Sequence, residues 1–76
     1  MNNRITVNPN IMYGKPCIRG MRVPVVRIVG GLAGAMSHQE VIEAYDVTEE
    51  DILACLEFAA ELIEAKGARF LSKRMP

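Results

Sequence analysis

Proline and glycine interrupt the first third of the chain so often that no long helix can form there. They recur at Pro9, Gly14, Pro16, Gly20 and Pro24. Because proline lacks the backbone donor and clashes with the preceding helical turn, these intervals leave room for about one helical turn. Short alternating runs lie between them, at residues 5–7 and on either side of Gly20. We therefore predict a small β-hairpin or ribbon in this segment.

Two short helices are expected after this segment. Pro24 suits the first position of a helix, and apolar residues then recur at helical spacing as far as Gly34, which we expect to end it. Ser37 and Glu40 form the S-x-x-E capping pattern, in which the hydroxyl and the carboxylate each bind a free backbone N–H. This pattern predicts a second helix that stops near Asp46.

A third and longer helix is predicted from about residue 49 to residue 66. Thr48 and the three acids after it form a start signal, because acids in the first turn complement the helix dipole. Gly67 is placed as its C-terminal cap. Three apolar residues lie off the main buried stripe: Leu53, Phe58 and Ala60. We expect part of this helix to meet a second copy or another protein; the alternative is that the N-terminal ribbon folds over it.

These elements predict a mainly α fold, namely a three-helix (helix-turn-helix) bundle with a short N-terminal β-hairpin or ribbon. We expect a single domain over residues 1–67 and a basic C-terminal tail over residues 68–76. A chain of 76 residues hides only about 60% of its unfolded surface on folding, so there is room for one small core.

Charge is divided into three blocks along the chain. Residues 1–36 carry five Lys or Arg and no acid, residues 37–65 carry nine acids and no Lys or Arg, and residues 66–76 carry four Lys or Arg and no acid. The net charge of zero is therefore the sum of +5, −9 and +4. Such blocks either attract one another, within the fold or between two copies, or form a polarised surface for a charged partner.

The two helices on either side of residues 46–48 have the arrangement of a helix-turn-helix, although Asp46 stands where the turn usually has glycine. The face that would enter the major groove consists of Thr48, Glu49, Glu50, Leu53, Ala54 and Glu57. None of these residues neutralises a phosphate, so this helix would be repelled from DNA. If DNA is bound, the better candidates are the basic residues Arg4, Lys15, Arg19, Arg22 and Arg27. The alternative for Arg22 and Arg27 is pairing with the acids of the second and third helices.

No catalytic constellation or metal-binding cluster is recognisable, and neither a cofactor nor enzymatic activity is expected. His38 lies beside the Ser37 cap with no Cys or second His near it in sequence, which indicates a surface histidine. Cys55 falls in the apolar stripe of the third helix, and Cys17 falls in a loop near basic residues, where it would be mildly reactive. The cysteine usage, the polar N-terminus and the shortness of the apolar stretches indicate a reduced, cytoplasmic protein without a membrane anchor.

One block of turn residues and arginines is specific enough to indicate a family. Residues 14–25 read GKPCIRGMRVPV, preceded by ITVNP at residues 5–9 and followed by SHQEV at 37–41 and TEEDI at 48–52. Over about residues 4–64 the chain resembles the domain-of-unknown-function family four-thirty-three. The resemblance implies a bacterial or archaeal three-helix, homeodomain-like domain with a short N-terminal ribbon, often dimeric. Its members look like antitoxins paired with PIN-like ribonuclease toxins, and such antitoxins are expected to bind their own promoter DNA as well.

The resemblance leads to a physical expectation about the partner. PIN-like nucleases hold Mg²⁺ with carboxylates, and an inserted arginine would pair with those acids and block metal and RNA. The expected partner-binding residues are Arg69, Lys73, Arg74, Leu53 and Phe58. Arg69 and Arg74 are one choice for the inserted arginine, and Arg19 or Arg22 is the other. The alternative function is a stand-alone helix-turn-helix regulator that binds DNA without a toxin.

Overall fold

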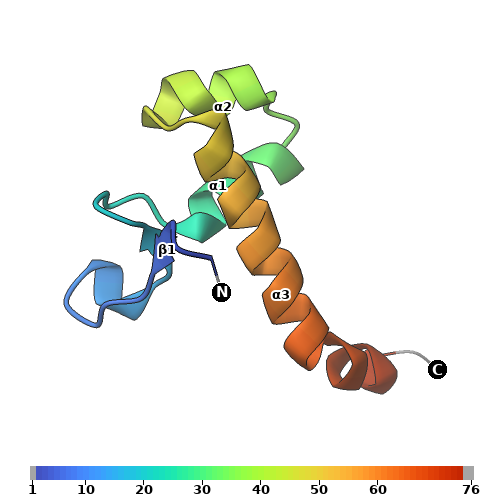
Figure 1. Cartoon of the computed structure of the whole chain (residues 1–76). Coiled ribbons are helices and arrows are strands. Elements are labelled where there is room, and N and C mark those ends of the chain that lie inside the picture. Colours follow the sequence, from blue (N-terminus) through green and yellow to red (C-terminus); the bar gives the residue numbers. More distant parts are fainter. Residues whose placement is uncertain (1, 75–76) are drawn as a thin grey trace.

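Three helices and a two-stranded antiparallel hairpin make up the fold, as the sequence predicts (Figure 1). The structure is a computed structural model that describes the backbone of residues 2–74 and the side chains of residues 2–65. The elements are β1 (Ile5–Thr6), the single turn η1 (Met12–Gly14), β2 (Cys17–Ile18), α1 (Val25–Ala33), α2 (His38–Tyr45) and α3 (Glu49–Arg74).

The hairpin is very short, because each of its strands has only two residues. Ile5 pairs with Ile18 and Thr6 with Cys17. The ladder is extended by the backbone N–H of Val25, which donates to the carbonyl of Pro16 at 2.9 Å and so links the hairpin to the start of α1. The buried side of the hairpin consists of Ile5, Cys17 and Ile18. The hairpin therefore supplies one small apolar face to the core.

The loop between the two strands contains a left-handed turn. Met12, Tyr13 and Gly14 have φ angles of 51°, 58° and 80°. Residues other than glycine rarely adopt this region, because Cβ approaches the backbone carbonyl. The turn carries the Tyr13 side chain outward, where it is 99% exposed.

The core lies where α1, α2 and α3 meet the hairpin. Its fully buried side chains come from β2, α1, the first half of α2 and α3: Cys17, Ile28, Val41, Ile52 and Cys55. Val47, in the turn before α3, is also buried, so the turn residues add to the core. Figure 1 shows α1 crossing α3 and α2 lying at the end of the bundle where α3 begins.

The predicted helix starts are confirmed to within one residue. Pro24, expected as the first residue of α1, is its cap residue instead, so the helix begins at Val25, and Gly34 follows its end. At α2 the backbone N–H of Glu40 donates to Ser37 Oγ at 3.0 Å, and the Ser37 N–H donates to Glu40 Oε1 at 2.7 Å. Both halves of the predicted capping box are therefore formed.

The predicted end of the third helix at Gly67 is wrong, because α3 continues through this residue to Arg74. A glycine inside a helix costs only about 1 kcal/mol relative to alanine, and the neighbouring Ala65, Lys66, Ala68 and Arg69 are strong helix formers. The local preference for helix on both sides of Gly67 outweighs the capping signal. The division into a domain of residues 1–67 and a tail of residues 68–76 stays a prediction, and residues 75–76 lie outside the described residues.

Two glycines of α1 differ in the space around them, and this difference generates a prediction. A Cβ added to Gly30 would meet nothing within 4 Å, whereas a Cβ at Gly31 would lie 3.0 Å from Met36 Sδ. Gly30→Ala should raise the free energy of unfolding by about 1 kcal/mol through helix propensity alone. Gly31→Ala should gain less or lose stability, since the same benefit is offset by the Met36 contact. Urea unfolding followed by circular dichroism measures both, and equal gains would contradict the packing described here.

Candidate functional site

The carboxylate of Asp51 joins the N-terminal segment to the start of α3. Arg4 Nη1 donates to Asp51 Oδ1 at 3.0 Å, forming an ion pair with a carboxylate that is almost completely buried. The other oxygen, Oδ2, accepts from the backbone N–H of Thr48 at 3.0 Å, and Thr48 Oγ1 accepts from the Asp51 N–H at 3.1 Å. Asp51 thus completes a capping box for α3 and also fixes Arg4.

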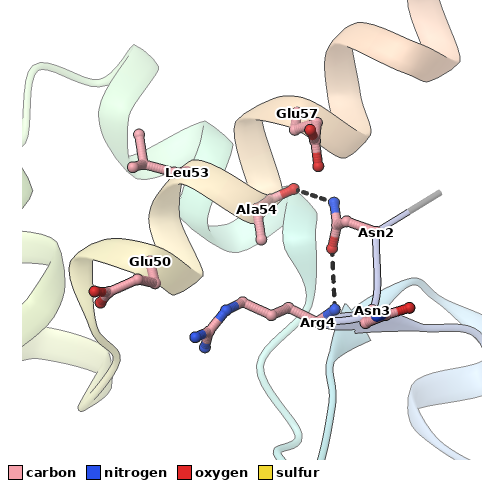
Figure 2. Close-up of a pocket in the computed structure, with 7 residues that line it drawn as sticks. All are labelled: Asn2, Asn3, Arg4, Glu50, Leu53, Ala54 and Glu57. Atoms are coloured by element: carbon pink, nitrogen blue, oxygen red, sulfur yellow. Dashed lines mark hydrogen bonds between the residues drawn. The ribbon is translucent and has the colours of Figure 1, made fainter.

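Asn2 adds a second attachment between this segment and α3. Its Nδ2 donates to the carbonyl oxygen of Ala54 at 3.0 Å, and its Oδ1 accepts from the backbone N–H of Arg4 at 3.1 Å. Figure 2 shows both bonds and the Arg4 side chain extending along α3 toward Glu50. We call residues 2–4 the N-terminal arm. It is held along one face of the first turns of α3.

An open cleft of about 350 Å³ lies between the N-terminal arm and α3 (Figure 2). Its lining combines the arm with four residues of the helix: Asn2, Asn3, Arg4, Glu50, Leu53, Ala54 and Glu57. Leu53 is 53% exposed, and both glutamates are exposed. The cleft therefore has an apolar patch with carboxylates on either side of it along the helix.

This cleft occupies the face of α3 that a helix-turn-helix protein would place in the major groove. Ala54, which the sequence pattern assigned to that face, is buried beneath the arm, so this assignment is wrong. Of the predicted partner-binding residues, Leu53 is accessible whereas Phe58 is partly buried against the core. The alternative that the N-terminal ribbon covers the residues off the main stripe does not hold at Leu53, which is 53% exposed; the arm is hydrogen-bonded to α3 at Ala54 instead.

The five basic residues of the N-terminal block divide into two groups. Arg4 pairs with Asp51, and Arg19 Nε donates to the carbonyl of Asn3 at 2.6 Å, so both hold the arm in place. Lys15, Arg22 and Arg27 are exposed, and among the described side chains none of them forms an ion pair. The predicted pairing of Arg22 and Arg27 with the acids of α2 and α3 is therefore not seen in the described part of the chain.

The predicted C-terminal cations Arg69, Lys73 and Arg74 all fall on α3. Their side chains lie outside the residues whose side chains the structure describes. The structure therefore assigns them a place along the helix axis, and their role as partner-binding residues stays a prediction.

The turn between α2 and α3 has helix-turn-helix geometry despite its sequence. Asp46 takes the left-handed conformation, with φ of 56°, that glycine usually provides. Asp and Asn adopt this conformation more readily than other residues with side chains. Across the turn His38 Nδ1 lies 2.8 Å from Glu49 Oε2, which joins the first turns of the two helices at the surface. The predicted surface position of His38 is confirmed.

The two cysteines are both buried and unpaired. Cys17 belongs to β2 and its Sγ donates to the carbonyl of Lys15 at 3.3 Å, so the expectation of an accessible loop cysteine is wrong. Burial, and secondarily the negative charge of Asp51, raise the pKa of the Cys55 thiol to about 11. Over the described residues, no group of three His, Cys, Asp or Glu side chains could hold a metal ion. No helix in the described range is long and apolar enough to cross a membrane.

The fold and the arm define a class: small three-helix domains in which a helix-turn-helix pair is preceded by a short hairpin. Within this class the chain belongs to the family described as "Protein of unknown function (DUF433)", whose model matches residues 5–59. Uncharacterized protein y4eO of Sinorhizobium fredii (strain NBRC 101917 / NGR234) is 28% identical over 72 residues, which are 95% of this chain and 33% of that protein. The chain thus spans about a third of the length of this curated relative.

A solved structure has the same fold. The crystal structure of a DUF433 member protein from Anabaena variabilis ATCC 29413 superposes with a TM-score of 0.76 at 25% sequence identity. The superposition covers 90% of this chain and 68% of that one. The likeness extends beyond the residues that the family model matches.

The ion pair of Arg4 and Asp51 generates a stability prediction. Arg4→Gln should lower the free energy of unfolding by about 1–2 kcal/mol, because it removes a charge-assisted hydrogen bond from a buried carboxylate. Arg22→Gln is the matched control and should change it by less than about 0.5 kcal/mol. In a double-mutant cycle with Asp51→Asn, the two substitutions should couple by roughly 1 kcal/mol. Additive effects in urea unfolding would show that the pair does not hold the arm.

Cys55 generates a prediction about alkaline pH. Its folded pKa of about 11 exceeds its ordinary value of 9.0, so between these values the folded chain retains a proton that the unfolded chain loses. This contribution to stability is complete below pH 9 and is lost as pH rises toward 11. The urea midpoint of the wild type should therefore fall more steeply over this range than that of Cys55→Ala. If the urea midpoints of the two proteins fell equally steeply with pH, this result would contradict the prediction.

Proposed function

We propose that this chain is the antitoxin of a toxin–antitoxin pair and acts by binding and neutralising a PIN-like ribonuclease, without catalysing a reaction itself. The observation that carries the proposal is the accessibility of Arg22 and Arg27, which are exposed and without an ion-pair partner among the described side chains. Unpaired guanidinium groups are available to a partner rich in carboxylates.

The chemistry of the expected partner matches these groups. A nuclease of this class gathers carboxylates around Mg²⁺, and arginine binds a carboxylate with two parallel hydrogen bonds. An arginine placed there would compete with the metal and with RNA. Of the two N-terminal candidates expected from the sequence, Arg22 is the better one, because Arg19 already donates to Asn3 in the arm. Arg69 and Arg74, with Lys73 between them, remain the second candidate set.

The surface of α3 favours a protein partner over DNA. Its first turns carry Glu49, Glu50 and Glu57, all exposed, and the arm covers Ala54. DNA affinity depends on cations that neutralise phosphates, so this face opposes entry into the major groove. In y4eO the matching stretch is a third of a longer chain, which is consistent with a binding module carried beside other sequence.

A second candidate, a DNA-binding regulator, is favoured by one observation. Lys15, Arg22 and Arg27 all lie in the segment that forms the hairpin and the start of α1, and all are exposed. These residues would bind phosphates instead of carboxylates. Affinity for promoter DNA would then fall steeply as salt is added, because each phosphate contact releases a counterion.

The proposal is tested by purifying the tagged chain from its host, identifying a stoichiometric nuclease, and measuring how purified variants inhibit that nuclease. Arg22→Ala with Arg27→Ala should weaken inhibition at least about tenfold, as expected for losing a charged hydrogen-bonded pair. Lys15→Ala is the control for loss of basic charge elsewhere in the N-terminal block and should inhibit nearly as well as the wild type.

Three outcomes would contradict this assignment. Undiminished inhibition by the Arg22/Arg27 variant and loss of inhibition by Arg69→Ala with Arg74→Ala would move the contact to the C-terminal set. Undiminished inhibition by both variants would eliminate the arginine mechanism. Recovery of promoter DNA with no nuclease, in repeated purifications, would favour the regulator.

A further inference from the structure

The second half of α3 extends beyond the rest of the fold. Among the side chains that the structure describes, Phe58 and Ala59 are the last partly buried ones of α3, and residues 60–65 are all exposed. The helix nevertheless continues to Arg74, and Figure 1 shows this part pointing away from α1, α2 and the hairpin. We call residues 60–74 the α3 extension. At 1.5 Å per residue it is about 22 Å long.

The α3 extension exposes apolar side chains that continue the buried stripe of the helix. Leu62 is 49% exposed and Ile63 is 63% exposed, and both follow Ile52 and Cys55 at helical spacing. Helices of this length are marginal in water unless an apolar face is packed, and Gly67 lowers the intrinsic stability further by about 1 kcal/mol. The extension therefore has the composition of a helix that is stabilised by another surface.

The distribution of charge along α3 indicates which kind of surface packs against the α3 extension. Residues 49–64 contain six acids and no cation, and residues 66–74 contain four cations and no acid. A parallel neighbour of the same sequence would place like charges together. An antiparallel neighbour places the acidic part of each helix beside the basic part of the other and also aligns the helix dipoles favourably.

We propose that the α3 extension pairs antiparallel with the α3 extension of a second copy of this chain. If the two extensions overlap over their whole length and stop short of the partner's three-helix bundle, the overlap is centred on Gly67. In this register position 63 lies opposite position 71, a leucine, and position 61 lies opposite position 73, a lysine. Glycine at the crossing has no Cβ, so the two backbones can approach closely there.

This pairing does not depend on a toxin or on DNA, so it is tested on the purified full-length chain alone. Sedimentation equilibrium should give a mass twice that of the 8.4 kDa chain. Ile63→Glu should raise the dimer dissociation constant at least about tenfold, because it places a charge in the apolar contact. Val26→Glu is the matched control: Val26 is 64% exposed on α1, and its variant should dimerise like the wild type.

Two further variants test the direction and the register. Glu61→Lys and Lys73→Glu, which exchange the charges of the two positions that face each other in this register, should each weaken the dimer, and the double variant should recover most of the loss. Gly67→Leu should weaken the dimer even though it raises helix propensity, whereas a purely local role for Gly67 predicts the opposite. Circular dichroism verifies that every variant is folded. A wild-type chain that stays monomeric at millimolar concentration, or an Ile63→Glu variant that dimerises normally, would overturn the proposal.

Discussion

The buried carboxylate of Asp51 is the interaction on which the remaining structure depends. It accepts hydrogen bonds from Arg4 at one oxygen and from the Thr48 backbone at the other. A carboxylate removed from water is unfavourable unless it is paired, so its position requires both the arm and the start of α3. The hairpin strands are only two residues each and could not hold the N-terminal segment by themselves. The hydrogen bonds to α3 supply the stabilisation of the N-terminal segment that the hairpin lacks.

This link changes the part of α3 that a helix-turn-helix protein would use to contact DNA. In a helix-turn-helix protein the first turns of the last helix are free to enter the groove. Here residues 2–4 are held against the same turns, and exposed glutamates lie beside them. The geometry of the α2–α3 turn is retained, including the left-handed Asp46, while the helix serves as an anchor for the chain's own N-terminus. A fold shared with DNA-binding domains therefore does not by itself assign a function, which depends on the surface.

Most of the fold is predictable because local sequence signals set its elements. The site is harder to predict because it depends on contacts between residues far apart in sequence. The Ser37 capping box, the turn at Gly20 and the stop at Gly34 each depend on residues within one turn of the chain, and all were predicted correctly. The end of α3 is not predicted correctly. Gly67 has helix formers on both sides, and the capping pattern does not show whether their helix propensity outweighs the tendency of glycine to end a helix. The Arg4–Asp51 pair joins residues 47 apart in sequence, and no periodicity reveals such a pair. A buried Asp in a first helical turn and an arginine in a polar arm were the only signals that could have indicated it.

The separation of Arg4 from Asp51 also has a consequence for the order in which the chain can fold during its synthesis. The ribosome releases residues 2–24 first, but their hydrogen bonds to Asp51 and Ala54 require a segment translated later. Until α3 has emerged, the nascent hairpin has only its own two-residue strands and α1 to stabilise it. Folding of this domain therefore completes only after the start of α3 has been translated, and a chain truncated before residue 51 would leave its N-terminal arm accessible to proteases.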